Sequence, residues 1–113
     1  MNDQTKTFET RCYELLKLIP KGKVTTYGEI ARALNTKAYQ AVGNAMAKNK
    51  NLFVIPCHRV IRSNGEIGNY ALGAEEKASL LREEGVALKG DKVQNLEAVI
   101  YRFKRYLSGN LSH

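Results

Sequence analysis

Residues 26–48 decide the fold that this sequence adopts, and they read TYGEIARALNTKAYQAVGNAMAK. Thr26 stands three residues before Glu29, which is the spacing of a capping box at a helix N-terminus. We therefore expect a helix that starts near Tyr27. Its apolar pattern stops at Asn35, a residue that commonly ends helices, so the helix should be short.

The polar turn after this helix leads directly to another one. Thr36 can cap it, and the pattern then runs to about Lys48. Two short helices joined by a tight polar turn predict a helix-turn-helix, whose second helix is presented to a nucleic acid. Small and apolar residues on that helix suit close approach to a groove floor, while part of the same set packs helix against helix. They are Ala41, Val42, Gly43, Ala45 and Met46.

Further helices are expected on both sides of this pair, at about residues 7–19, 74–84 and 96–107. Thr7 serves as N-cap of the first, and Gly85 serves as the C′ residue of the second. The last helix carries five apolar residues at helical spacing, which we interpret as core. They are Leu96, Val99, Ile100, Phe103 and Leu107.

Little β-structure is expected. Residues Leu52–Ile55 are predicted to form a short strand. The pair Asn64-Gly65 is typical of a two-residue hairpin, here flanked by Val60-Ile61 and Ile67, and such a hairpin would form a wing. Residues 86–93 are expected to be a short, irregular excursion.

The predicted fold class is therefore mainly α with a small β-hairpin, a winged helix-turn-helix. A chain of 113 residues forms one domain that buries its own core, with residues 1–6 and 108–113 expected as frayed tails. Apolar runs are short, and no secretion signal follows Met1, so no membrane contact is expected. The default is a monomer in a reducing compartment, cytoplasmic and nucleoid-associated in a prokaryote or nuclear in a eukaryote.

The charge balance points to a polyanionic partner. The net charge is +7 and the pI is near 9.5, although this signal alone is weak. Two cysteines are too few for a disulfide scaffold, and no ligand spacing typical of a zinc site is present. We therefore expect no metal site.

The segment Ile55-Pro56-Cys57-His58-Arg59-Val60 carries the candidate chemistry. Pro56 restricts the chain before Cys57, so the thiol is held in a defined position. His58 and Arg59 are expected to lower its pKa and raise the thiolate fraction. A packing cysteine is the alternative, and Cys12, on the apolar stripe of the first helix, is interpreted in that way.

Four motifs together resemble the O6-alkylguanine-DNA alkyltransferase family. They are Pro56-Cys57-His58-Arg59-Val60, Gly68-Asn69-Tyr70, Thr26-Tyr27-Gly28-Glu29 and Ala41-Val42-Gly43-Asn44-Ala45-Met46. The resemblance covers roughly residues 7–90 and corresponds to the C-terminal, DNA-binding and catalytic domain, without the N-terminal domain that many members carry.

The resemblance implies a suicide DNA repair protein. Its partner is double-stranded DNA that contains alkylated guanine, bound in the minor groove. The damaged nucleotide is flipped out, and the alkyl group on guanine O6, or on thymine O4, is moved irreversibly to a cysteine of the protein. The donor is the DNA itself, so the resemblance implies no cofactor.

The resemblance also assigns catalytic roles to five residues. Cys57 matches the alkyl acceptor, and His58 matches the histidine that takes the thiol proton through a water. Glu84 matches the glutamate that polarises this histidine. Tyr27 matches the tyrosine that gives a proton to the departing guanine, and Asn49 matches the asparagine that braces the turn before the strand.

The substrate pocket and the DNA contacts complete this set. Tyr70 matches a pocket wall, and the backbones of Val60 and Ala71 should read the guanine edge. Arg59 matches a structural arginine at the DNA-binding surface, for which salt bridging is expected. The DNA-facing residues of the predicted recognition helix are Tyr39, Gln40, Ala41 and Gly43.

Gln40 departs from the family pattern, which has an inserted arginine at this position, so Tyr39 is the alternative wedge. This departure keeps open a second reading, a non-reacting alkyltransferase-like protein that binds alkylated DNA and recruits other repair factors. Such relatives usually lack the acceptor cysteine, and Cys57 argues against that reading. A winged-helix regulator is a third reading, but it leaves the Cys57 motif unexplained.

Overall fold

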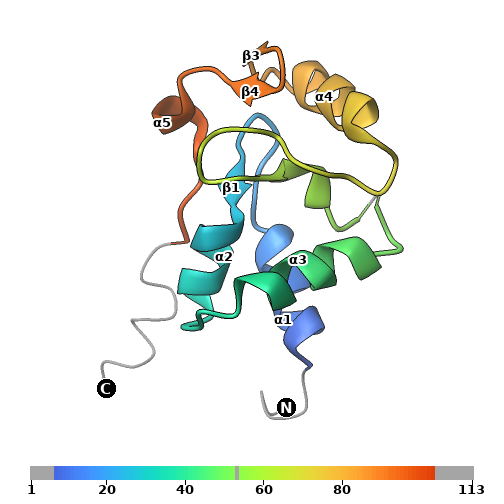
Figure 1. Ribbon diagram of the computed structural model, residues 1–113, viewed down its shortest axis with the longest axis vertical. Coiled ribbons are helices and arrows are strands. Elements are labelled where there is room, and N and C mark those ends of the chain that lie inside the picture. The colour runs from blue at the N-terminus through green and yellow to red at the C-terminus, as the bar shows by residue number, and fades with distance from the viewer. Residues whose placement is uncertain (1–6, 53, 104–113) are drawn as a thin grey trace.

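A computed structural model describes residues 7–52 and 54–103, which are mostly helical with two small sheets (Figure 1). The elements in chain order are α1 (Phe8–Leu16), β1 (Thr25–Thr26), α2 (Tyr27–Ala33), α3 (Tyr39–Lys48), the 3₁₀-helix η2 (Cys57–Arg59), β2 (Val60–Ile61), α4 (Ala74–Glu83), β3 (Leu88–Lys89), β4 (Lys92–Val93) and α5 (Leu96–Val99). No helix within the described ranges combines the length and the apolar character needed to cross a membrane.

The first helix begins as predicted. The Thr7 hydroxyl accepts a hydrogen bond from the Thr10 backbone N–H at 3.1 Å, which confirms Thr7 as the N-cap of α1. The helix ends at Leu16, earlier than the predicted Ile19, because the backbone tightens there: the Ile19 N–H bonds to the Leu16 carbonyl at 3.1 Å. Ile19 is still buried.

The cap of α2 is confirmed as well. The Thr26 hydroxyl accepts from the Glu29 backbone N–H at 3.0 Å. The Glu29 carboxylate does not complete a capping box; it accepts from Arg32 at 2.7 Å and from Arg102 at 2.8 Å. Those two guanidinium groups compete successfully because a charged donor bonds a carboxylate more strongly than a backbone N–H does.

The predicted cap of α3 at Thr36 is wrong. The Thr36 hydroxyl accepts from the Ala38 backbone N–H, only two residues ahead, at 3.0 Å, so it stabilises the interhelical turn. Asn35 ends α2 in the left-handed region with a φ of 56°. The helix therefore starts late, at Tyr39, with Ala38 at the N-cap position and no side-chain cap.

No strand forms between Leu52 and Ile55 among the described residues, so that prediction is wrong. The backbone N–H groups of Val54 and Ile55 both bond to the Asn51 carbonyl, at 3.2 and 2.9 Å, which makes a turn. The buried Asn49 side chain then holds the Ile55 carbonyl at 2.9 Å. These three backbone groups are therefore already paired and cannot join a strand ladder.

The hairpin predicted around Asn64-Gly65 is also wrong. Val60–Ile61 form β2, which pairs in parallel with β1 through Thr25↔Val60 and Thr26↔Ile61. The segment after β2 makes only a tight turn, in which the Gly65 N–H bonds to the Arg62 carbonyl at 2.9 Å. Gly65 has a φ of 94°, which explains the glycine.

The antiparallel hairpin lies in the segment that was expected to be irregular. Strands β3 and β4 pair through Leu88↔Val93 and Lys89↔Lys92, and Gly90, with a φ of 64°, lies in the turn between them. An isolated bridge then joins Glu66 to Lys92. The segment after Gly65 is therefore bridged to β4, and not to β2 as the predicted hairpin required.

The last predicted helix is cut short. Helix α5 ends at Val99, and Ile100 instead bridges Val24 in parallel, beside β1. The Thr25 hydroxyl donates to the Tyr101 carbonyl at 2.8 Å, and Phe103 enters the core. The backbone leaves the helix because an extended segment pairs with the chain before β1. Leu107 and both predicted tails lie outside the described residues.

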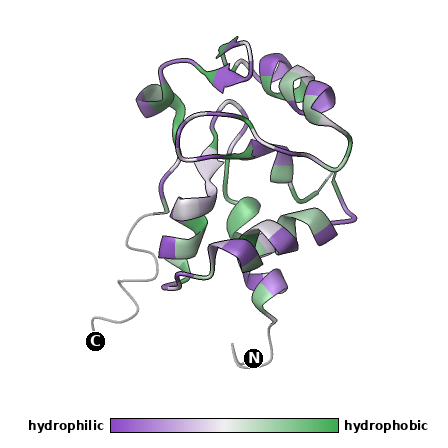
Figure 2. Ribbon diagram, viewed as in Figure 1, coloured by the Kyte–Doolittle hydropathy of each residue, from purple (hydrophilic) through white to green (hydrophobic). Residues whose placement is uncertain are grey.

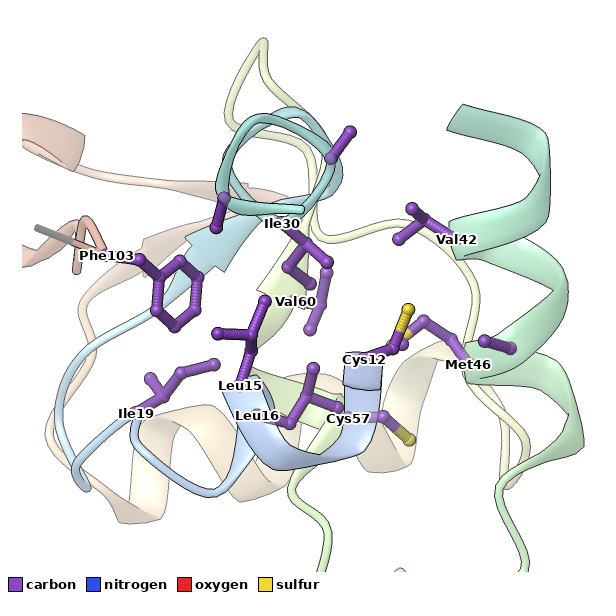
Figure 3. Close-up of a cluster of buried hydrophobic side chains, with 13 residues drawn as sticks. Cys12, Leu15, Leu16, Ile19, Ile30, Val42, Met46, Cys57, Val60 and Phe103 are labelled. Atoms are coloured by element: carbon purple, nitrogen blue, oxygen red, sulfur yellow. The ribbon is translucent and has the colours of Figure 1, made fainter. Parts of the chain in front are cut away.

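The core consists of two clusters. The larger one joins α1, α2 and α3 to Cys57, Val60 and Phe103 (Figure 3), and it includes Cys12, as predicted. The other packs β2, β4 and α4 around Ile61, Leu81 and Val86. Polar and apolar stretches alternate along α3 and α4, as amphipathic helices require (Figure 2). Gly85, with a φ of 94°, ends α4 as predicted.

Candidate active site

Cys57 lies at the start of η2, directly after Pro56, and belongs to the larger core cluster. Its side chain borders a cavity of about 620 Å³. The walls of this cavity come from the first residue of α2, from α3 and from the segment 69–71. The predicted site residues on these walls are Tyr27, Tyr39, Gln40, Gly43, Cys57, Tyr70 and Ala71. The fold thus brings together residues that are up to 44 positions apart (27 and 71) in the sequence.

His58, the next residue of η2, pairs with the end of α4. Its Nε2 lies 2.9 Å from Glu84 Oε2, and both side chains are largely buried. Among the described residues, the buried Nδ1 of His58 has no hydrogen-bond partner. A carboxylate beside Nε2 favours the tautomer that carries its proton there, which leaves Nδ1 as an acceptor.

Arg59 binds the same carboxylate. Its Nε donates to Glu84 Oε1 at 2.9 Å and its Nη2 donates to Glu84 Oε2 at 2.7 Å, a bidentate pair. Its Nη1 donates to the Ile19 carbonyl at 2.7 Å. Arg59 therefore ties η2 to α4 and to the chain after α1. This agrees with the salt bridging expected of it, and Arg59 does not line the cavity.

These contacts set the protonation states of the pair. Burial lowers the pKa of His58, and the charges of Arg59 and Lys77 lower it further, while Glu84 opposes the shift. The imidazole is therefore neutral at neutral pH. Burial alone would raise the pKa of Glu84, but the hydrogen bonds from Arg59 and His58 outweigh it and hold the pKa below its usual value. The site thus combines a neutral base with an ionised partner.

The thiol behaves differently from the prediction. Burial raises the pKa of Cys57, and the hydrogen bond from Asn49, the charge of Lys77 and a backbone hydrogen bond only partly offset this rise. The expected lowering by His58 and Arg59 is wrong for this pocket, because His58 is neutral and the Arg59 charge is paired with Glu84. The resting side chain is a thiol, which needs a base to become a nucleophile.

Asn49 lies where it can brace the segment before Cys57. It is buried, its Nδ2 donates to the Ile55 carbonyl at 2.9 Å, and its Oδ1 accepts from the Asn51 N–H at 2.9 Å. The side chain therefore replaces two backbone partners in a turn. Through the hydrogen bond to the thiol it also opposes the rise in the pKa of Cys57.

Lys77 is a site residue that sequence reasoning missed. Its side chain on α4 has no exposed surface, and its Nζ donates to the Val60 carbonyl at 2.7 Å and to the Asn69 carbonyl at 3.0 Å. Burial lowers its pKa to about 8, opposed by Cys57 and assisted by Arg62. The available signal was its spacing of four from Leu81, which places a lysine on the apolar face of a helix.

Two predicted substrate contacts are placed differently by the structure. Val60 is fully buried, its carbonyl accepts from Lys77, and it is not among the residues that line the cavity. Ala71 is exposed and lines the cavity beside Tyr70. Of the two backbones expected to read the guanine edge, only that of Ala71 borders the open space in this structure.

Helix α3 has two different faces. Val42, Ala45 and Met46 are buried against α1 and α2, so part of the small-residue set packs helix against helix. Tyr39 is 56% exposed, Gln40 is exposed, and Gly43 has open space where a side chain would be. Ala41 is half-buried and outside the cavity walls. The exposed face lets a large ligand approach the helix backbone closely.

Within residues 7–52 and 54–103, no group of three or more His, Cys, Asp or Glu side chains gathers in a way that could hold an ion. The chemistry available at this site is that of a buried thiol next to a neutral, carboxylate-paired imidazole, in a pocket beside an exposed helix face.

The fold and this site define a small, mostly helical protein with a buried thiol at a pocket beside an exposed helix face. A sequence model of the family described as "6-O-methylguanine DNA methyltransferase, DNA binding domain" matches residues 7–86. The chain therefore belongs to this family.

Three similar proteins illustrate the relationship. The methylated-DNA–protein-cysteine methyltransferase of Thermococcus kodakarensis is 51% identical over 80 residues, which are 70% of this chain and 45% of that protein. A structure of S. pombe Atl1 in complex with damaged DNA containing O6-carboxymethylguanine is 33% identical, with a TM-score of 0.73, over 91% of this chain and 99% of that one. A Mycobacterium tuberculosis OGT structure in complex with DNA is 38% identical, with a TM-score of 0.67, over 70% and 50% of the chains. The chain spans about half the length of the Thermococcus protein.

Proposed function

We propose that this chain is a DNA repair protein that transfers a methyl or other alkyl group from guanine O6 to the sulfur of Cys57. The observation that carries the proposal is the buried Cys57 thiol at the pocket, followed in sequence by His58 with its 2.9 Å contact to Glu84. Family membership over residues 7–86 and the names of the relatives support the same chemistry.

His58 acts as the base for the thiol. It is neutral at neutral pH, and its buried Nδ1 has no partner among the described residues. A water between this nitrogen and the sulfur carries the proton from Cys57 to His58. Glu84 then stabilises the imidazolium that forms, as the third member of a nucleophile, base and orienter set.

The thiolate attacks the alkyl carbon on guanine O6. The S–C bond forms as the C–O6 bond breaks, and the electron pair of the broken bond remains on the base. Tyr27 gives its phenolic proton to the departing guanine, and burial raises the pKa of this phenol so that it stays protonated until then. The thioether is stable, so each molecule reacts once, and no cofactor takes part because DNA is the donor.

The alkylated base enters the cavity after it leaves the DNA stack, at a cost of about a few kcal/mol. A volume of about 620 Å³ is sufficient for a single nucleotide base. Tyr70 forms one wall, and the Ala71 backbone reads the guanine edge. The Val60 backbone can contact the guanine edge only after it becomes accessible, because its carbonyl accepts a hydrogen bond from Lys77 in this structure.

The DNA lies against α3. We assign α2 and α3 to a helix-turn-helix of the winged type, in which the turn at residues 62–66 serves as the wing. The exposed residues Tyr39 and Gln40, with the half-buried Ala41 and Gly43, face the minor groove, and Tyr39 or Gln40 fills the gap left by the flipped nucleotide. The net charge of +7 favours this partner.

The chain corresponds in this proposal to the C-terminal catalytic and DNA-binding part of its longer relatives, with residues 1–113 as one domain. A monomer, located in the cytoplasm of a prokaryote or in the nucleus of a eukaryote, remains our prediction. These points rest on the family resemblance and on the alignment with about half of the Thermococcus protein.

The second candidate is a protein that binds alkylated DNA without reacting and recruits other repair factors. The alignment with S. pombe Atl1 covers 99% of that chain, and the Atl1 complex holds DNA that contains O6-carboxymethylguanine, so this similarity supports lesion binding. Gln40 also favours this candidate. Cys57 and the His58–Glu84 pair oppose it, because mere recognition of a lesion needs neither a thiol nor a base.

Intact mass spectrometry separates the two candidates. Wild type and Cys57→Ser are incubated with a duplex that contains one O6-methylguanine. A gain of one methyl group in the wild type, absent from Cys57→Ser, is the expected result. An unchanged mass together with tight binding to the lesion would instead establish the non-reacting protein.

A further inference from the structure

Arg62 stands out on the wall of the cavity. It follows β2 directly, and among the described residues that line the cavity it is the one with a formal charge at neutral pH. The other lining side chains are aromatic, aliphatic or amide groups, together with the Cys57 thiol. A cavity that takes only a neutral base has no need of a guanidinium group, so Arg62 calls for a different ligand.

The guanidinium group is available for such a ligand. Arg62 is exposed, and within residues 7–52 and 54–103 its side chain makes no hydrogen bond or ion pair. Three other described arginines bind carboxylates: Arg32 binds Glu29, Arg59 binds Glu84, and Arg102 binds Glu29 and Glu97. An unpaired arginine at a pocket is a natural partner for an anion, because its planar fork matches two oxygens at once.

The backbone around Arg62 holds it in position. Its N–H bonds to the Glu66 carbonyl and its carbonyl accepts from the Gly65 N–H, both at 2.9 Å, so the residue lies at the start of a closed turn. Its side-chain stem passes over Gly68, where an added Cβ would be 3.4 Å from Arg62 Nε and 3.5 Å from its Cγ. This support reduces the side-chain entropy that binding would cost.

The charge of Arg62 also reaches the reactive groups. Burial raises the pKa of Tyr27, and the charge of Arg62 opposes that rise. Burial lowers the pKa of Lys77, and Arg62 lowers it further. The guanidinium group therefore lies near both the wall phenol and the buried ammonium, and no carboxylate among the described lining residues offsets this positive charge.

We propose that the Arg62 guanidinium binds a backbone phosphate of the nucleotide that enters the pocket. This inference rests on the proposed function. A nucleotide that leaves the stack brings its own flanking phosphates to the mouth of the cavity, while its base moves inside. Arg62 then anchors the extruded nucleotide through its phosphodiester, independently of which alkyl group the base carries.

The salt dependence of binding tests the charge. Binding is measured in the Cys57→Ser background, so that no transfer occurs, on a duplex with one O6-methylguanine. Arg62→Gln is expected to weaken binding about tenfold. It should also reduce the slope of log K against log salt by about 0.9, the value for one phosphate contact. Arg62→Lys should keep the slope. Arg82→Gln, on the exposed face of α4, is the matched control and should leave both quantities unchanged.

Neutral phosphates identify the contact. Methylphosphonates replace, one at a time, the phosphates that flank the lesion. At one position the replacement should weaken DNA binding by the protein that retains Arg62 about tenfold. The same replacement should not weaken DNA binding by Arg62→Gln any further. Equal losses for both proteins at every position, or an unchanged salt slope in Arg62→Gln, would overturn the proposal.

Intact mass spectrometry of the wild type, run beside these binding measurements, separates this inference from the proposed function. If the wild type gains no methyl group and binds the lesion duplex no better than undamaged DNA, the proposed function itself fails, and the role of Arg62 fails with it. If the wild type transfers the methyl group while Arg62→Gln keeps both the affinity for the lesion duplex and the salt slope, only the assignment of Arg62 is wrong.

Discussion

Glu84 holds His58 and Arg59 with a single carboxylate: Oε2 lies 2.9 Å from His58 Nε2 and 2.7 Å from Arg59 Nη2. The same residue that orients the candidate base therefore also joins α4 to η2. Because the two functions share one side chain, a change at Glu84 should affect both reactivity and stability.

Glu84→Gln is expected to slow alkyl transfer by about 10²-fold, because the imidazolium loses its counter-charge. The free energy of unfolding should fall by about 3 kcal/mol, since Arg59 remains buried without its partner. Single-turnover transfer and urea unfolding measure the two effects. Glu83→Gln, on the neighbouring exposed position, is the control and should change neither. A transfer rate in Glu84→Gln equal to the wild-type rate would remove Glu84 from the mechanism.

The stability of the protein should depend on pH through His58. Its folded pKa lies below the ordinary value of 6.5, so the unfolded chain binds a proton that the folded chain does not. The free energy of unfolding should therefore fall as the pH drops below 6.5, by up to about 1.4 kcal/mol per pH unit, until the folded pKa is reached. Above pH 6.5 this contribution is constant.

Chemical unfolding at several pH values measures this dependence, with His58→Gln as comparison. The variant should show a shallower fall between pH 6.5 and 5. In the wild type the transfer rate should fall only at lower pH, as the pH approaches the folded pKa of His58, because protonated His58 is no longer a base. Identical pH profiles of stability for both proteins would show that His58 does not titrate abnormally.

Asn49→Ala removes the side chain that holds the turn before Cys57. The Asn51 N–H loses its partner and the Ile55 carbonyl keeps only the Cys57 N–H, so we expect a loss of about 1–3 kcal/mol in stability. The pKa of the Cys57 thiol should rise further, because its hydrogen bond to Asn49 disappears. Thiol titration by alkylation rate checks this shift, and Asn51→Ala is the matched control. A lower thiol pKa in Asn49→Ala would contradict the assignment.

Gln40→Arg tests the departure from the family pattern on α3. A guanidinium at this exposed position adds a charge next to the cavity, so binding to the lesion duplex should become several-fold tighter. The slope of log K against log salt should become steeper by about the value for one phosphate contact. Gln94→Arg adds the same charge at an exposed position after β4 and controls for net charge. Equal gains for both variants would mean that position 40 has no special place on the DNA.

The sequence alone determined the local features of this protein. Thr7 and Thr26 cap their helices as predicted, Gly85 ends α4, and Cys12 lies in the core. Each of these follows from short-range physics: a side-chain oxygen reaches a backbone N–H three residues away, a glycine adopts a positive φ, and a stripe repeats with the helical period. The cysteine motif identified the candidate nucleophile for a similar reason, since its neighbours are adjacent in the chain.

Only the tertiary structure decided the long-range features. The sequence of Val60–Ile61 does not show whether this strand pairs with the residues after Gly65 or with β1. The observed pairing with β1 depends on residues 35 positions away (25 and 60). Ile100 leaves a helical pattern because the chain before β1 offers it backbone hydrogen bonds. The sequence places Lys77 on the apolar face of a helix, but only the tertiary structure supplies the carbonyls of Val60 and Asn69 that bind its ammonium group. The raised pKa of Cys57 has the same origin: burial outweighs the charges next to it in the sequence, because Glu84 arrives from α4 to pair with Arg59.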